Sequence, residues 1–427
     1  MKLRRDSTLI AYALRFLVAV AVLAGTALGR DAAFRTIYKF RGSPDGWDAV
    51  GVPAVAKNGD LYGVTFNGGN SDEGTVFQLT APQTRGGVWK EAVLYDFPGN
   101  GQQSPSLVIL GPDGNLYGVN STLTIFELKA PALPGGAWKY VSLHTLNGNS
   151  DGSAIQNLVF GADGNIYGAT ELGGNSCGCG TVFELKRPAQ NGRKWPFRVL
   201  YSFTGKPDGN EPFAGVTFDQ LGNLFGTTFR GGTNDWGAVF RLKPPTKRGG
   251  AWTETVLYSF DPNNNDIISP EGPVTFDSSG NLYGTTPTGG DLNCAGGFGC
   301  GVVYELSPPT EKGKDWTFTS LYAFQDGNDG AVPGGYMVFD SRRNLYGATQ
   351  QTGRGNGYSG AAFRLSPPAG ETSVWTETTL HKFIAPDDAG CTGGLTWGRW
   401  GHLYGVTQLG GTGCQGLGCG TAFELRP

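Results

Sequence analysis

Histidines, carboxylates and cysteines are the residues of this sequence that could do acid–base or metal chemistry. The 427-residue chain has three histidines, His144, His381 and His402. His144 and His381 stand where other copies of a repeated motif carry tyrosine, and His402 stands where they carry asparagine. We therefore expect structural roles for all three, with no Ser-His-Asp triad and no histidine-bound metal.

A group of aspartates recurs in the segments between repeats, each directly before a glycine: Asp45, Asp151, Asp208 and Asp329. Asp387 and Asp388 lie in the same region of the last such segment. The favoured interpretation is a repeated Asp-Gly turn, because Asp bonds to its own backbone and Gly accepts positive φ. The alternative is a ring of acids at one mouth of a channel that holds Ca²⁺ through oxygen ligands. No other cofactor is expected.

The seven cysteines fall mostly in pairs within equivalent loops. Cys294 and Cys300 flank one loop and Cys414 and Cys419 flank another, so two local disulfides are expected. Cys177 and Cys179 occupy a third such loop and form the weakest predicted pair, because one residue separates them. The partner of Cys391 stays open. A metal site is the disfavoured alternative, since the spacings differ and no histidine is near.

The motif that positions these residues is Leu-Tyr-Gly or a close variant, which occurs seven times at intervals of 50 to 63 residues. The copies begin at Leu61, Leu116, Ile166, Leu224, Leu282, Leu345 and Leu403. A period of this size indicates one supersecondary unit per repeat. In the fifth copy, segments 272–277, 282–286, 302–306 and 316–324 are separated by turn residues, which predicts four short antiparallel strands.

Seven four-stranded meanders around one axis predict an all-β, seven-bladed β-propeller. The last repeat supplies only three strands, at about 392–398, 402–407 and 420–426, whereas residues 35–40 match the missing fourth strand. We expect this N-terminal strand to complete the last blade and leave no free sheet edge at the seam. Tryptophans that recur on the predicted fourth strands are assigned to the scaffold: Trp89, Trp138, Trp195, Trp252, Trp316 and Trp375.

The combined pattern Asp-Gly-Asn-Leu-Tyr-Gly, a Gly-Gly loop, Gly-Thr-Val-Phe-Glu-Leu and Trp…Leu-Tyr-Ser-Phe resembles the GloVer tandem repeat of secreted bacterial proteins. The resemblance covers nearly the whole chain after its first segment, and it implies an extracytoplasmic repeat protein without a defined biochemical role. Family members often carry a C-terminal sorting anchor. This chain ends directly after Phe423-Glu424-Leu425, so we expect release in soluble form.

Residues 1–29 are predicted to be a signal peptide. Lys2, Arg4 and Arg5 precede an apolar run at 16–28, and Ala27-Leu28-Gly29 suits a signal peptidase. An uncleaved anchor is the alternative. Residues 30–427 are expected to form one propeller domain, monomeric, secreted or periplasmic, without a membrane span after cleavage. The net charge of −3 offers no basic face, which argues against a nucleic-acid partner.

Function is expected on the face of the ring that carries the second-to-third-strand and inter-blade loops, because the first-to-second-strand turns are tight. Residues that break the repeat there are the predicted ligand-binding set: Asp235, Trp236, Phe298, Arg354 and Tyr358. Aromatics beside Asp and Arg suit sugars or peptides. The leading hypothesis is a non-enzymatic binding module for a glycan, peptide or cell-envelope partner. The alternatives are a carboxylate-dependent hydrolase or lyase acting on polysaccharide at the channel mouth, and a structural envelope protein.

Overall fold

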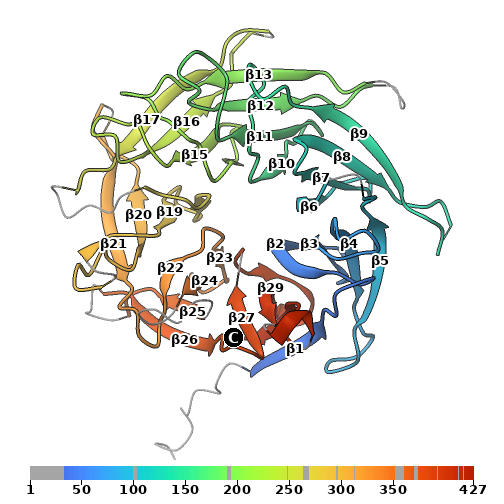
Figure 1. The fold of residues 1–427 in the computed structure, drawn as a ribbon. Helices are drawn as coiled ribbons and strands as arrows, with labels where there is room; N and C mark the ends of the chain where they lie inside the picture. The colour runs from blue at the N-terminus through green and yellow to red at the C-terminus, as the bar shows by residue number, and fades with distance from the viewer. Residues whose placement is uncertain are drawn as a thin grey trace, which may run out of the picture.

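The chain forms a ring of seven antiparallel sheets around a central opening, a seven-bladed β-propeller (Figure 1). The structure is a computed structural model. It describes residues 33–99, 103–133, 135–189, 194–247, 249–262, 269–294, 297–311, 313–351, 360–369, 374–391, 393–411, 413–416 and 418–427. Within these ranges no α-helix occurs, and the all-β prediction is confirmed.

Each blade runs from an inner strand beside the central opening to an outer strand at the rim of the ring. The innermost strands are β2 (Trp47–Val55), β6 (Pro105–Leu110), β10 (Leu158–Phe160), β14 (Val216–Phe218), β18 (Thr275–Phe276), β22 (Ala331–Pro333) with β23 (Val338–Phe339), and β27 (Asp388–Cys391) with β28 (Thr396–Trp397). The second strands are β3 (Leu61–Asn67), β7 (Leu116–Asn120), β11 (Ile166–Thr170), β15 (Leu224–Thr228), β19 (Leu282–Thr286), β24 (Leu345–Gln351) and β29 (Leu403–Gly410).

The third strands are β4 (Thr75–Thr80), β8 (Thr124–Lys129), β12 (Thr181–Leu185), β16 (Ala238–Lys243), β20 (Val302–Ser307), β25 (Ala361–Ser366) and β30 (Thr421–Arg426). The outermost strands are β5 (Lys90–Asp96), β9 (Lys139–Thr145), β13 (Phe197–Ser202), β17 (Thr253–Ser259), β21 (Thr317–Ala323), β26 (Thr376–Lys382) and β1 (Ala33–Lys39). Two 3₁₀ turns, Arg399–Gly401 and Cys414–Gly416, lie in the last blade.

The N-terminal strand closes the ring as predicted. β1 pairs antiparallel with β30, with Phe34 opposite Leu425 and Lys39 opposite Thr421. Figure 1 shows the blue N-terminal strand on the outside of the red C-terminal blade. Both ends of the described chain are thereby held in one sheet.

The outer strands carry a feature that the sequence analysis missed. In blade four, Val239 lies opposite Tyr258 while the next residue, Phe240, lies opposite Val256, so Leu257 is an extra residue. Such a β-bulge breaks strict alternation and increases the local twist. It explains why apolar residues fall on both faces of this strand, and the same register shift recurs in the outer pair of each blade.

Neighbouring blades are joined by aromatic contacts. Tyr167 of β11 meets Phe218 of the next blade edge-on at 5.0 Å and Trp252 of that blade at 6.4 Å between ring centroids. Equivalent tryptophan contacts join Trp89 to Tyr404, Trp138 to Tyr62, Trp195 to Tyr117 and Trp375 to Tyr283. The predicted scaffold role of these tryptophans is confirmed.

The histidines also serve these junctions. The His144 ring stacks on Phe197 of the next blade at 4.3 Å, and its Nε2 lies 2.9 Å from Asp151 Oδ2. His381 stacks on Phe34 at 3.5 Å in the same manner. His402 Nδ1 lies 2.5 Å from Glu424 Oε1, where the asparagine of other blades meets the equivalent glutamate. The predicted structural roles hold, and burial lowers the pKa of His402.

The repeated aspartates belong to the outer part of the same junctions. Each pairs with an aromatic side chain on the preceding outermost strand. Tyrosine hydroxyls donate in three cases, Tyr38 to Asp45, Tyr201 to Asp208 and Tyr322 to Asp329, and His144 contacts Asp151 in the fourth. The structure therefore places these carboxylates against the outer strands and not at the mouth of the channel. Binding of Ca²⁺ by them stays a prediction.

Three junctions bring a second carboxylate to this aspartate in place of a stacked ring, namely Glu91, Glu254 and Glu377. The Tyr38 hydroxyl donates to Asp45 and lies 3.5 Å from Glu91 of the next blade. Burial, reinforced by the Asp45 carboxylate, raises the pKa of Glu91 to about 7. Burial and Asp208 likewise raise the pKa of Glu254 to about 7. Glu91 and Glu254 take up protons on folding near neutral pH.

The replacement of both Glu91 and Glu254 by Gln should flatten the pH dependence of stability. Because their folded pKa values exceed the unfolded value, their stabilising contribution is present below about pH 4.5 and is lost as pH rises through 7. Wild-type melting temperature should thus fall between pH 5 and 8 more steeply than that of the double variant. Glu311→Gln, at an exposed connector site, should retain the wild-type slope. Equal slopes in all three proteins would contradict the assignment.

Tyr304→Phe should stabilise the protein. Six other blades place a phenylalanine at this position, namely Phe77, Phe126, Phe183, Phe240, Phe363 and Phe423. The Tyr304 ring is fully buried and its hydroxyl has no hydrogen-bond partner among the described residues. Removal of an unsatisfied buried hydroxyl is expected to gain about 1–3 kcal/mol, seen as a higher urea midpoint. The reverse change, Phe240→Tyr, should lower the midpoint, and a loss of stability in Tyr304→Phe would refute the argument.

Candidate functional site

The central opening of the ring contains a cavity of about 640 Å³. Its walls come from the inner strands and the segments that precede them in all seven blades. One part of the wall is aliphatic, with Val50, Val52, Leu107, Val108 and Ile109. A well-formed, partly apolar pocket with a few convergent polar groups is the default candidate for a binding site.

A repeated backbone turn at the loop face aims side chains into this cavity. Asp48, Glu211 and Val332 have left-handed φ values of 64°, 59° and 57°. Their N–H groups donate to carbonyl oxygens of the preceding blade, on Cys419, Cys179 and Cys300 respectively. Ala154 and Ser269 are also left-handed, both with a φ of 59°. Two residues after each of these five positions the chain faces the cavity, which brings in Val50, Gln156, Phe213, Glu271 and Gly334.

The polar side chains of the cavity wall are few and uncharged, with one exception. Gln156, Asn157, Gln350 and Tyr336 offer amide and phenol groups and Ser106 a hydroxyl, and Glu271 is the single carboxylate among the described lining residues. Phe66 and Phe213 supply aromatic surface on the same wall. Burial raises the pKa of Glu271, and no opposite charge or hydrogen bond counters that effect.

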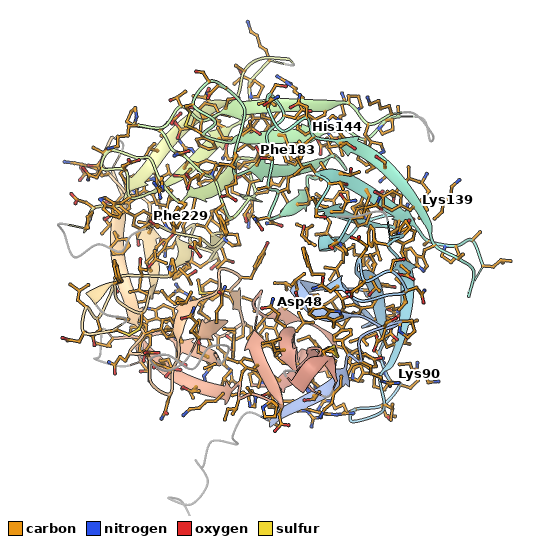
Figure 2. All side chains as sticks on the ribbon, in the orientation of Figure 1. Asp48, Lys90, Lys139, His144, Phe183 and Phe229 are labelled. Atoms are coloured by element: carbon orange, nitrogen blue, oxygen red, sulfur yellow. A yellow bond between two sulfur atoms is a disulfide. The ribbon has the colours of Figure 1, made fainter. Side chains whose placement is uncertain are left out.

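Further acids stand near the cavity but have partners. Glu211 Oε2 lies 3.6 Å from Arg230 Nε. Burial, followed by repulsion from Glu211, raises the pKa of Glu171, while a hydrogen bond from Gln156 opposes the shift. Asp48, labelled beside the central opening in Figure 2, accepts a hydrogen bond from Asn67 at 3.2 Å, and burial raises its pKa.

The predicted ligand-binding residues that the structure describes lie on the loop face but do not line the cavity. Asp235 holds a turn, because its Oδ1 accepts the Gly231 N–H at 3.0 Å. Trp236 is 41% exposed and its carbonyl accepts the Ser269 N–H, in the place that cysteines take in other blades. Phe298 is 70% exposed. Arg354 and Tyr358 lie outside the described residues, and a binding role for this set stays a prediction.

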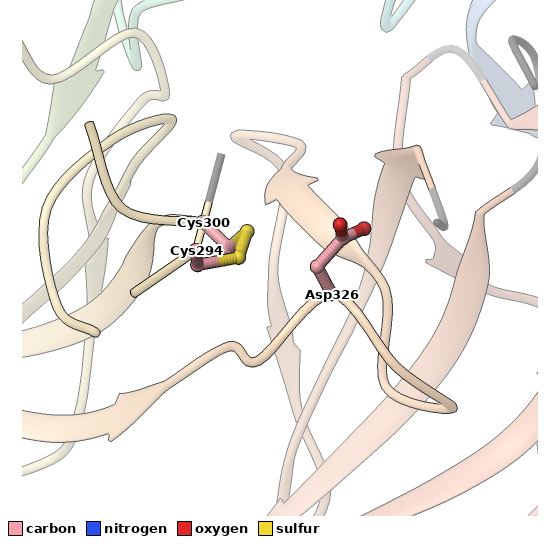
Figure 3. Close-up of side chains that lie close together, drawn as sticks. All are labelled: Cys294, Cys300 and Asp326. Carbon is pink, nitrogen blue, oxygen red and sulfur yellow. A yellow bond between two sulfur atoms is a disulfide. The ribbon is translucent and has the colours of Figure 1, made fainter. Parts of the chain in front are cut away.

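The cysteines form local disulfides as expected. Cys294 pairs with Cys300 and Cys414 with Cys419. Cys177 also pairs with Cys179, at a Cα–Cα distance of 5.3 Å, although this was the weakest predicted pair. Figure 3 shows Asp326 beside the Cys294–Cys300 bridge, but sulfurs joined in a disulfide are not thiolate ligands, so these three residues do not make a metal site. The side chain of Cys391 lies outside the description.

The sequence analysis did not identify the cavity residues. Gln156, Phe213 and Glu271 occupy one position of the repeat, where blade one carries Val50 and blade six Gly334. A comparison of the repeats column by column would have shown that this position varies in polarity from blade to blade. This position lies next to the inner strands and outside the long loops, where aromatic and charged residues were expected to mark a site.

Several solved structures share the ring architecture at low sequence identity. An extracellular domain of a putative hybrid two-component system from B. thetaiotaomicron is 12% identical, with a TM-score of 0.55, over 93% of this chain. The match spans 41% of that protein, so the present chain corresponds to about two fifths of its length. A fungal alcohol oxidase of the AA5 family, in complex with copper, is 15% identical, with a TM-score of 0.56, over 93% of this chain and 77% of that one.

A third similar structure is YCF48 from Cyanidioschyzon merolae, 13% identical with a TM-score of 0.52 over 93% of this chain and 99% of that one. At these identities the likeness concerns the fold alone. No curated protein matches the sequence.

No helix in the described part of the chain has the length and apolar character needed to cross a membrane. The sequence model of the Gloeobacter/Verrucomicrobia repeat matches residues 124–298 and 248–427, which together make up well over half of the chain. The protein therefore belongs to the Gloeobacter/Verrucomicrobia repeat family.

Proposed function

We propose that this protein is a non-enzymatic binding module that holds a peptide segment of an extracytoplasmic partner in the loop-face mouth of its channel. The observation that carries the proposal is the open cavity of about 640 Å³, with aliphatic and aromatic walls and a few polar groups. Binding sites for ligand side chains have this composition. Three disulfides support an oxidising compartment.

The lining favours a peptide over a glycan. A sugar ring presents hydroxyl groups around its edge, and each buried hydroxyl without a partner costs about 1–3 kcal/mol. The aliphatic wall of β2 and β6 offers no side-chain partners for them at Val50, Val52, Leu107 or Val108. Apolar peptide side chains lose no hydrogen bonds against such a wall, while Gln156 and Gln350 can pair with peptide groups.

A carboxylate-dependent hydrolase or lyase is the second candidate. Glu171 and Glu211 are close enough to repel each other, and the raised pKa of Glu171 is the property of a general acid. Because Glu171 and Glu211 lie beside the cavity, they could act on a polysaccharide bound there. Cleavage of an added polysaccharide would favour it over binding.

Gly334→Phe should block peptide binding. Gly334 has no positive φ, and an added Cβ would lie 3.3 Å from the Ala348 carbonyl oxygen, a tight contact that a shift of a few tenths of an ångström relieves. Blade four already carries Phe213 at the same repeat position, so the new ring should fit the fold and fill the mouth. Peptides selected from a random display library on residues 30–427 should bind the variant roughly tenfold or more weakly by calorimetry.

The matched control is Leu221→Phe, which adds a ring at an exposed tight-turn site on the opposite face and should leave affinity unchanged. A glycan array and a polysaccharide-cleavage assay on the same protein test the alternatives. Binding of glycans alone, cleavage of any polymer, or peptide affinity that Gly334→Phe leaves intact would overturn the proposal.

A further inference from the structure

Glu271 is the one charged residue among the described residues of the cavity wall. It makes no hydrogen bond or ion pair with any residue that the structure describes. Other carboxylates near the cavity are different, since Glu211 pairs with Arg230 and Asp48 with Asn67. Among the residues that the structure describes, Glu271 is thus an unpaired acid, and the lining includes no lysine, arginine or histidine.

An unpaired carboxylate in a partly buried site is costly for the protein. Burial alone raises the pKa of Glu271, which records the energetic penalty for its charged form. A positive group brought by a ligand would remove that penalty and form a charge-assisted hydrogen bond, one of the stronger polar contacts available. A neutral ligand group would leave this energetic penalty in place, and an anionic group would increase it.

The rest of the wall also suits a cation. Phe66 and Phe213 line the same cavity, and aromatic faces attract ammonium and guanidinium groups. The side-chain amide oxygens of Gln156 and Gln350 are acceptors for N–H donors. The aliphatic wall can cover the stem of a lysine or arginine, whose methylene groups favour apolar surroundings.

We propose that the channel mouth is selective for a basic side chain, so that a lysine or arginine of the bound peptide enters the cavity and pairs with Glu271. This inference rests on the proposed function, in which the channel holds a peptide, and it adds the chemistry that decides which peptide is held. The residue that sets the preference is Glu271, and the aromatic and amide groups that line the same cavity assist it.

The test uses the peptides that random display selects on residues 30–427. They should be enriched in lysine or arginine. In the tightest binder, norleucine in place of the basic residue should weaken binding to wild type by about ten- to hundredfold. The same change should have little effect on binding to Glu271→Gln, so that the two losses are not additive. Glu271→Lys should prefer a peptide with glutamate at that position.

Controls separate a binding role from a structural one. Glu271→Gln should melt at or above the wild-type temperature, because it removes an unpaired carboxylate. Glu311→Gln removes the same charge from an exposed connector and should leave every affinity unchanged. Calorimetry with CaCl₂ asks whether the carboxylate holds a metal instead; saturable Ca²⁺ binding that Glu271→Gln abolishes would overturn the proposal.

Failure of this inference can be told apart from failure of the proposed function. Some selected peptides could bind the wild type and lose affinity for Gly334→Phe. If these peptides carry no basic residue, or bind equally well with norleucine in its place, the basic preference alone is wrong. If no selected peptide depends on the open mouth, the binding function is wrong and the preference falls with it.

Discussion

The ring depends on one kind of contact between neighbouring blades, in which an aromatic side chain of the second strand packs against one or two rings of the next blade. Tyr167 on the second strand of blade three lies between Phe218 and Trp252 of blade four. Each such side chain removes about 150–250 Å² from water, but only when the neighbouring blade is present. No blade can bury this surface alone, so the seven sheets are stable as a closed set.

The last junction shows how strong this requirement is. The sequence before β1 has no tryptophan, so blade seven lacks the usual ring for Tyr346 of blade six. Trp397 stands where blades three to six carry phenylalanine. It meets Tyr346 edge-on at 5.3 Å and donates its indole N–H to the Phe339 carbonyl at 2.8 Å. One larger ring thus covers Tyr346 from the inner strand and compensates for the missing tryptophan beside the outer strand.

The sequence was sufficient for the architecture and insufficient for the site, for physical reasons. The seven Leu-Tyr-Gly copies and the strand at 35–40 determine blade number and closure, because each repeat imposes the same packing. The bulge at Leu257 was missed, since its extra residue leaves no local signal beyond broken alternation. The cavity was missed because its lining depends on how closely inner strands approach: a Cβ on Gly335 would lie 2.1 Å from Gly272 Cα. That distance is a property of the closed ring.

Two polar residues, Tyr304 and Glu271, depart from the repeat. Their surroundings show which of them is a packing defect and which is a candidate binding residue. Tyr304 buries its hydroxyl in a fully enclosed core, where no ligand can reach it. Glu271 faces an open cavity, so its unpaired carboxylate can be satisfied from outside. Both conflict with the local preference for apolar or paired groups, and such conflicts in natural proteins gather at functional or strained sites. Only Glu271 is accessible to a ligand from solvent, so it is the candidate binding residue of the two.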